Sequence, residues 1–176
     1  MDKHITVPFN REISRSLRAG DYVYLSGTIF VARDAAHKRM QEAMDAGEPL
    51  PIDIKDQVIY YMGPSPAREG RAIGSAGPTT ASRMDKYTPK LLDLGLMGMI
   101  GKGKRKAEVR EAMVRNGCVY FAAVGGAGAL LSKCITSSEV IAYEDLGAEA
   151  IRKLTINEFP AIVVMDSKGN CLYDAY

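Results

Sequence analysis

The sequence has few residues that bind transition metals and none of the long apolar runs that a membrane requires. No apolar run reaches the ~20 residues that span a bilayer. The first ten residues, MDKHITVPFN, lack the hydrophobic core of a secretory signal peptide. We therefore expect a cytoplasmic protein that has no membrane partner.

Neither positive nor negative charge is in large excess. The formal net charge is +2, which is too small to indicate nucleic acid or an anionic membrane surface as a partner. The one short basic run consists of Lys102, Lys104, Arg105 and Lys106. A run of this kind is typical of a solvated first helical turn, so we expect these four side chains to face water.

Cysteine and histidine are too few and too dispersed for a metal centre in this chain. Cys118, Cys134 and Cys171 have neither the spacing of a disulfide framework nor that of a cluster-binding motif. We expect them to be buried, unligated thiols. His37, which precedes two basic residues, is expected on a solvated helix face, and no set of zinc ligands is present.

The remaining composition is that of a globular protein. The chain has 176 residues, of which 47% are hydrophobic and 25% charged, and we expect one domain over residues 1–176. Apolar stretches alternate with helical patterns, with strands expected at 21–32 (bent at Gly27), 57–63, 95–100 and 118–124, and helices at 33–48, 104–117 and 130–135. Residues 160–176 indicate a hairpin around Lys168-Gly169. These elements predict an α/β fold with a mixed, partly parallel sheet.

The stretch GSAGPTTASRMD, residues 74–85, is the first candidate for a binding site. Pro78 at the first helical position would place Thr79 and Thr80 in the opening turn, with Arg83 on the same face. Free amides, two hydroxyls and a guanidinium would then suit a carboxylate. The residues alone leave open whether this segment binds an anion or only begins a helix.

Two more cations lie where strands are expected to end. Arg33 follows the strand of residues 21–32, and Lys102 lies between two glycines that would let the backbone approach a ligand. Ligands of open α/β sheets bind where strands end and helices begin. A helix cap beside Asp34 and an ordinary flexible turn remain the simpler readings of these two positions.

A second glycine-rich turn, VGGAGALLS, suggests a nucleotide site. Gly125, Gly126 and Gly128 follow an apolar strand, and Glu144 ends a later apolar run. The full G-x-G-x-x-G pattern is missing, and no phosphate-binding loop of the G-x-x-x-x-G-K-[ST] type is present. A stand-alone nucleotide- or anion-binding module is therefore the rival interpretation.

Five motifs, in this order, carry a resemblance to a known family: SGTIFVARDAAHKR, YYMGPSP, GSAGPTTASRMD, GKG and FAAVGGAGALLS. Together they resemble the C-terminal (beta) part of class I fumarate hydratases, which L-tartrate dehydratases of the same iron–sulfur hydro-lyase family share. The resemblance extends from about Ile5 to the last strand. It implies a swivelling β/β/α-type domain.

The resemblance also implies a cofactor outside this chain. In that family three cysteines of the alpha part hold a [4Fe-4S] cluster, whose open iron polarises the hydroxyl that is lost. The beta part closes over the cluster and contributes substrate-binding residues. Because the chain begins at Met1 without an alpha region, we expect a separate beta subunit, with its alpha partner, in a dimer of alpha–beta pairs.

The resemblance assigns roles to five residues. It implies that Arg33, Thr79, Thr80, Arg83 and Lys102 bind a dicarboxylate substrate, that Thr79 also takes part in proton transfer, and that none of them binds metal. An alcohol is a weak base, so Thr79 would need a partner group. The sequence does not distinguish fumarate from tartrate. A purely structural subunit is a further alternative, against which the five intact residues argue.

Overall fold

Strands of both directions form one seven-stranded sheet in the computed structural model, which describes residues 2–63, 77–124 and 128–175. The strands are β1 (Lys3–Val7), β2 (Tyr22–Val31), β3 (Val58–Tyr60), β4 (Gly98–Gly101), β5 (Val119–Ala123), β6 (Ile135–Ala142) and β7 (Ile151–Met165). Strands β1 to β5 are parallel neighbours in chain order, and β7 is antiparallel to β2, β5 and β6. The predicted α/β fold with a mixed, partly parallel sheet is confirmed.

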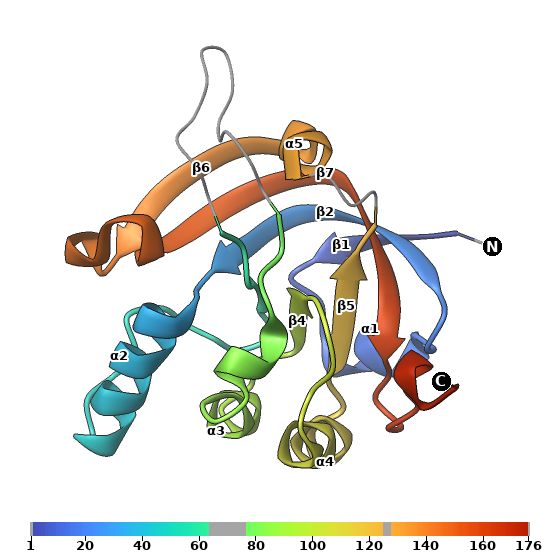
Figure 1. Cartoon of the computed structure of the whole chain (residues 1–176), viewed down its shortest axis with the longest axis horizontal. Coiled ribbons are helices and arrows are strands. Elements are labelled where there is room, and N and C mark those ends of the chain that lie inside the picture. The colour runs from blue at the N-terminus through green and yellow to red at the C-terminus, as the bar shows by residue number, and fades with distance from the viewer. Residues whose placement is uncertain (1, 64–76, 125–127, 176) are drawn as a thin grey trace.

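The long strand β7 closes this sheet into a barrel-like ring. One edge of β7 pairs with β2 from Arg152 to Ile162, and the other edge pairs first with β6 and then with β5. In Figure 1, β6 and β7 curve together over one side of the molecule. Large apolar side chains fill the interior, where the rings of Tyr60 and Phe159 pack edge to face with centroids 5.4 Å apart.

Helices α2, α3 and α4 lie on the other side of the strands from β6 and β7 (Figure 1). The α-helices are α1 (Arg11–Ser16), α2 (Asp34–Asp45), α3 (Thr88–Asp93), α4 (Ala107–Asn116) and α5 (Gly128–Leu131), and the 3₁₀ helices are η1 (Ala81–Met84), η2 (Ser132–Cys134), η3 (Glu144–Glu149) and η4 (Leu172–Ala175). The two long helices α2 and α4 were both predicted. Within the described residues, none of these helices has the length and apolar character needed to cross a bilayer.

At Gly27, where a bend in β2 was predicted, the pairing of β2 with β7 is irregular, and β7 has one residue more than β2 between the paired positions. The register between β2 and β7 shifts between Leu25 and Gly27, and Gly27 has a φ of 130°. A Cβ atom at this position would lie 2.1 Å from the carbonyl oxygen of Val7 on β1. The missing side chain therefore lets β1 and β2 approach each other.

The predicted C-terminal hairpin is only partly correct. Its first strand is the end of β7, but the chain after the turn forms η4 and keeps only an isolated bridge between Met165 and Cys171. The Asp166 carboxylate accepts hydrogen bonds from the backbone N–H groups of Lys168 and Asn170. This side-chain turn satisfies groups that a second strand would have paired.

Candidate functional site

Three neighbouring parallel strands bring functional groups to one edge of the sheet. Arg33 lies two residues after β2, Tyr61 directly follows β3, and Lys102 directly follows β4. Since β2, β3 and β4 are parallel and adjacent, their carboxyl ends meet at the same edge. This edge is the candidate functional site.

The segment around Thr79 crosses this edge and links two of the strand ends. The backbone N–H of Thr79 donates to the Tyr61 carbonyl at 2.7 Å, and the Thr79 hydroxyl donates to the same oxygen at 2.8 Å. The next residue, Thr80, forms a parallel bridge with Lys102. Thr79, Thr80 and Lys102 are therefore held together by backbone hydrogen bonds.

The prediction that Thr79 and Thr80 open a helix is wrong. Thr80 has extended backbone angles, and the helical turn η1 begins only at Ala81. The N–H groups of Thr79 and Ala81 already donate to carbonyl groups of the strand ends, so they are not the free amides that we expected. Residues 74–76 of the same motif lie outside the described residues.

Arg33 and Thr79 meet beside Gly63. A Cβ atom on Gly63 would lie 3.2 Å from Cγ2 of Thr79 and 3.6 Å from Nη1 of Arg33, so the glycine leaves the space that both side chains occupy. Arg33 occupies the N-cap position of α2, but its side chain makes no capping hydrogen bond. Its Nε atom is buried and has no hydrogen-bond partner within the described residues.

Arg83 reaches the same region through an ion pair. Its Nη2 atom donates to a carboxylate oxygen of Asp34, the first residue of α2. The Arg83 side chain remains 55% exposed. Because a guanidinium has five N–H donors, Arg83 retains donors for a second carboxylate while Asp34 holds one of them.

Lys102 is one of the three exposed residues among the five predicted site residues, with Thr80 and Arg83. Its side chain is exposed, and its ammonium group has no ion-pair partner in the part of the chain that the structure describes. The preceding Gly101, which we expected to face a ligand, is instead buried against Tyr61 and Ala81, whose atoms would lie 2.8 and 3.2 Å from an added Cβ.

The basic run was predicted incorrectly at Arg105. Its side chain is 0% exposed and forms an ion pair with Asp85, with 2.6 Å between Nε and Oδ1. Residues 102–106 precede α4 rather than forming its first turn. A charge run within the sequence therefore contains one side chain that points into the protein.

His37 was also predicted incorrectly, because it is buried and not solvated. Its Nδ1 atom lies 2.8 Å from the Arg33 carbonyl oxygen, its ring packs against the rings of Tyr61 and Tyr87, and Nε2 has no partner within the described residues. Burial lowers the pKa of His37 from 6.5 to about 4, against the raising effect of the Arg33 hydrogen bond. His37 is therefore neutral at physiological pH and donates to Arg33.

This buried histidine predicts a loss of stability in mild acid. Below pH 6.5 the unfolded chain binds a proton at His37 that the folded chain does not bind until about pH 4, so the free energy of unfolding falls as the pH is lowered. Between pH 7 and pH 5 we expect His37 to remove about 2 kcal/mol. Urea titrations at both pH values measure the loss, which should shrink in His37→Asn.

The other histidine of the chain provides the control. His4 is exposed, so His4→Asn should retain the full loss of stability between pH 7 and pH 5. An equal pH dependence in wild type and His37→Asn would contradict the role given to burial.

The cysteines do not fit an iron–sulfur cluster held by this chain. Burial raises the pKa of Cys118 to about 12, which opposes formation of the thiolate that a cluster requires. Cys118 is buried as predicted, whereas Cys134 and Cys171 are half-buried. Within the described residues, no group of three or more histidine, cysteine and acidic residues could hold a metal ion.

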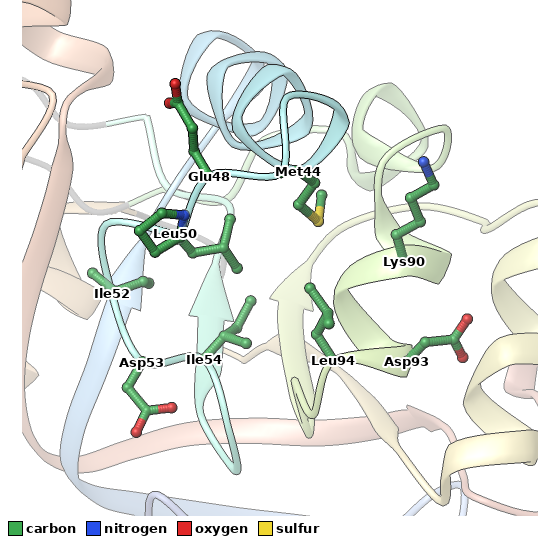
Figure 2. Close-up of a pocket in the computed structure, with 11 residues that line it drawn as sticks. Met44, Glu48, Leu50, Ile52, Asp53, Ile54, Lys90, Asp93 and Leu94 are labelled. Atoms are coloured by element: carbon green, nitrogen blue, oxygen red, sulfur yellow. The ribbon is translucent and has the colours of Figure 1, made fainter.

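A separate apolar cavity of about 650 Å³ lies at the far end of α2. Figure 2 shows Met44, Ile54 and Leu94 pointing toward its centre, where the loop of residues 47–54 faces α3. Met44 is near the end of α2, whereas Arg33 directly precedes its start. The cavity is thus distinct from the candidate site, and none of the five predicted site residues lines it.

The strand topology argues against the nucleotide interpretation. A dinucleotide-binding unit needs a second strand parallel to the first, but β5 is followed in the chain by β6 and β7, and β7 is antiparallel to β5. Gly125 and Gly126 of the glycine-rich turn lie outside the described residues, and Gly128 begins α5.

Comparison with known proteins identifies the family. The model of the family described as Fumarase C-terminus matches residues 2–176. The chain belongs to this family. The resemblance that the sequence motifs predicted is therefore confirmed.

The similar proteins are named either fumarate hydratases or a tartrate dehydratase subunit. The chain is 47% identical over 148 residues to the aerobic class I fumarate hydratase of Escherichia coli K12, which covers 83% of the chain and 27% of that protein. It is 44% identical over 156 residues to fumarate hydratase 2 of Leishmania major, which covers 88% of the chain and 28% of that protein. The chain thus spans less than a third of these fumarate hydratases.

A third similar protein is matched over most of its length. The chain is 37% identical over 166 residues to the putative L(+)-tartrate dehydratase subunit beta of Methanocaldococcus jannaschii, with 91% of the chain and 85% of that subunit aligned. The family therefore includes a subunit of about the size of this chain.

Proposed function

We propose that the chain is the beta part of a hydro-lyase that reversibly hydrates fumarate to L-malate. The observation that carries this proposal is the meeting of Arg33 and Thr79 beside Gly63, at the sheet edge that also presents Lys102. Cationic and hydroxyl groups at one edge suit a dicarboxylate. The similarity to class I fumarate hydratases supports the reaction type.

The position of each side chain supports the role that we propose for it. Arg33, Arg83 and Lys102 would bind the carboxylates of the substrate, and Thr80, which is exposed next to them, would donate a further hydrogen bond. In dehydration, the C–H bond beside the departing hydroxyl breaks, and a base of the partner subunit would take up the proton with Thr79 as its hydrogen-bonding intermediary. Since the Thr79 hydroxyl hydrogen points to the Tyr61 carbonyl, its oxygen lone pairs can accept a hydrogen bond from the group that carries this proton.

A partner completes the proposed enzyme. We propose that an alpha subunit holds the [4Fe-4S] cluster, because no group of three or more cysteine, histidine and acidic side chains in the described residues of this chain could hold a metal ion. Residues 1–176 would form a single domain of the swivelling β/β/α type that closes over the partner, within a dimer of alpha–beta pairs in the cytoplasm. The match to most of a tartrate dehydratase beta subunit supports this arrangement.

L-Tartrate dehydration is the second candidate. The alignment to 85% of a putative tartrate dehydratase subunit favours it, while the higher identity to fumarate hydratases favours fumarate. Both substrates are diacids with the same carboxylate groups. Assays with fumarate, L-malate and L-tartrate distinguish the two activities.

Arg83→Ala tests the proposed function through substrate binding. The assembly of the chain with its partner, reconstituted anaerobically with iron and sulfide, should hydrate fumarate, and Arg83→Ala should raise KM about tenfold because one charge-assisted carboxylate contact is lost. Initial rates over a range of fumarate concentrations measure the change.

Arg115→Ala is a matched control. Arg115 is also 55% exposed and also paired with an aspartate, Asp93, but it lies on α4 away from the candidate site. We expect this variant to keep the wild-type KM. A wild-type assembly that acts on none of the diacids would refute the proposed function.

A further inference from the structure

Beneath the candidate site lies a buried ion pair that the proposed reaction does not use directly. The side chains of Arg105 and Asp85 are 0% and 1% exposed. Asp85 also accepts the backbone N–H of Lys106 at 2.7 Å through its second oxygen. Both oxygens of the buried Asp85 carboxylate thus accept hydrogen bonds, and a buried charge needs such partners.

The guanidinium of Arg105 contacts the segments that carry the site residues. Its Nη2 atom donates to the Tyr61 hydroxyl at 3.1 Å, and the Tyr61 carbonyl is the group that holds both the N–H and the hydroxyl of Thr79. Asp85 directly follows η1, which carries Arg83. Arg105 itself lies in the loop that begins with Lys102.

Aromatic rings and one hydroxyl fix the guanidinium further. The rings of Tyr61 and Tyr120 lie 5.2 and 4.9 Å from its Cζ atom, and Nη2 donates a second hydrogen bond, to Thr88, at 3.1 Å. The Tyr120 hydroxyl donates to the Gly103 carbonyl next to Lys102. The planar guanidinium therefore links three segments, those of Tyr61, Asp85 and Arg105 itself. A lysine ammonium lacks the planar set of donors that makes these contacts together.

We propose that Arg105 is a positioning residue that fixes Thr79, Arg83 and Lys102 relative to one another. This inference rests on the proposed function, because the three residues are those that would contact the diacid. Arg105 touches no substrate and acts through Tyr61 and Asp85. Misplacement by about 1 Å suffices to cost a large factor in rate.

The test compares substitutions of Arg105 and Tyr61, the buried cluster, with a substitution in the exposed pair Arg115–Asp93. Arg105→Lys keeps the charge but loses the planar fork, and Tyr61→Phe removes a single hydroxyl while leaving the Arg105–Asp85 pair in place. Arg115→Lys is the control, because Arg115 donates three hydrogen bonds to exposed Asp93. Tyr61→Phe keeps the test decisive if Arg105→Lys does not fold.

Activity of the assembled enzyme is the first readout. We expect kcat to fall at least tenfold in Arg105→Lys and severalfold in Tyr61→Phe, with no change in Arg115→Lys. A positioning residue acts through its target, so Arg105→Lys should cost much less in a Thr79→Ala background. Equal costs in both backgrounds, or an unchanged kcat in Arg105→Lys, would overturn the inference; if Arg105→Lys does not fold, an unchanged kcat in Tyr61→Phe would do so.

Hydrogen exchange of the full chain is the second readout. The amides of Thr79, Ala81 and Lys102, which pair the site segments, should exchange at least tenfold faster in Arg105→Lys, while the amides of β7 stay protected. A uniform increase across the chain would show a merely structural role. An inactive wild-type assembly refutes the proposed function, whereas an active one with an unaffected Arg105→Lys refutes the positioning role alone.

Discussion

Thr79→Ala should lower kcat for fumarate hydration about a hundredfold in the assembled enzyme, the scale of a lost proton-transfer group. The hydroxyl is held by the Tyr61 carbonyl at 2.8 Å, so the substitution removes an oriented group rather than a free one. KM should change little, because in the proposed function the carboxylates would be bound by Arg33, Arg83 and Lys102. Steady-state kinetics at saturating fumarate measures the effect.

Two further variants separate the hydroxyl from the shape of the side chain. Thr79→Val retains the methyl group that fills the space beside Gly63, and it should be as impaired as alanine. Thr79→Ser retains the hydroxyl and should keep most of the activity. A fully active valine variant would remove Thr79 from the chemistry.

Gly27→Ala should destabilise the fold by at least about 3 kcal/mol, because the new Cβ would lie 2.1 Å from the Val7 carbonyl oxygen. The backbone angle adds strain, since φ at Gly27 is 130°. The strands β1 and β2 would have to separate at Gly27, which is paired with Val7. Urea unfolding followed by circular dichroism measures the free energy of unfolding.

Gly47→Ala is the control for an alanine at a positive φ where no clash occurs. Gly47 also has a positive φ, of 70°, but an added Cβ would meet nothing within 4 Å. We expect a cost of only about 1 kcal/mol there. Similar losses in the two variants would show that backbone strain, rather than the clash with β1, dominates at Gly27.

Local patterns predicted the elements that position the site. The apolar run before Arg33 and the helical pattern after it correctly placed β2 and α2, because both signals act over neighbouring residues. Turn glycines also gave correct boundaries. Gly117 adopts the left-handed conformation that ends α4.

The errors concern interactions between distant segments. Arg105 lies in a basic run, and only its pairing with Asp85, twenty residues earlier, explains its burial. His37 follows a helical pattern that does not reveal the aromatic rings of Tyr61 and Tyr87 packed against it. No pattern within a short window contains such partners. The motif YYMGPSP was the one signal that could have directed attention to Tyr61 and Gly63.

Contacts with distant segments also explain why Thr79 and Thr80 do not open a helix. Gly-Pro-Thr favours a helix start, but the backbone N–H groups of Thr79 and Ala81 donate instead to the carbonyl groups of Tyr61 and Lys102. Tertiary pairing overrode the local preference. The residue types of the candidate site could be predicted from sequence, whereas their backbone geometry could not.

The closing strand β7 sets the order in which this chain can fold during synthesis. Tyr22 pairs with Ile162, so β2 leaves the ribosome long before its partner exists. Until β7 is made, β2 and β5 each lack a neighbour and present open edges to other chains. Such distant pairing folds slowly. We therefore expect the ring of strands to close only after β7 has left the ribosome.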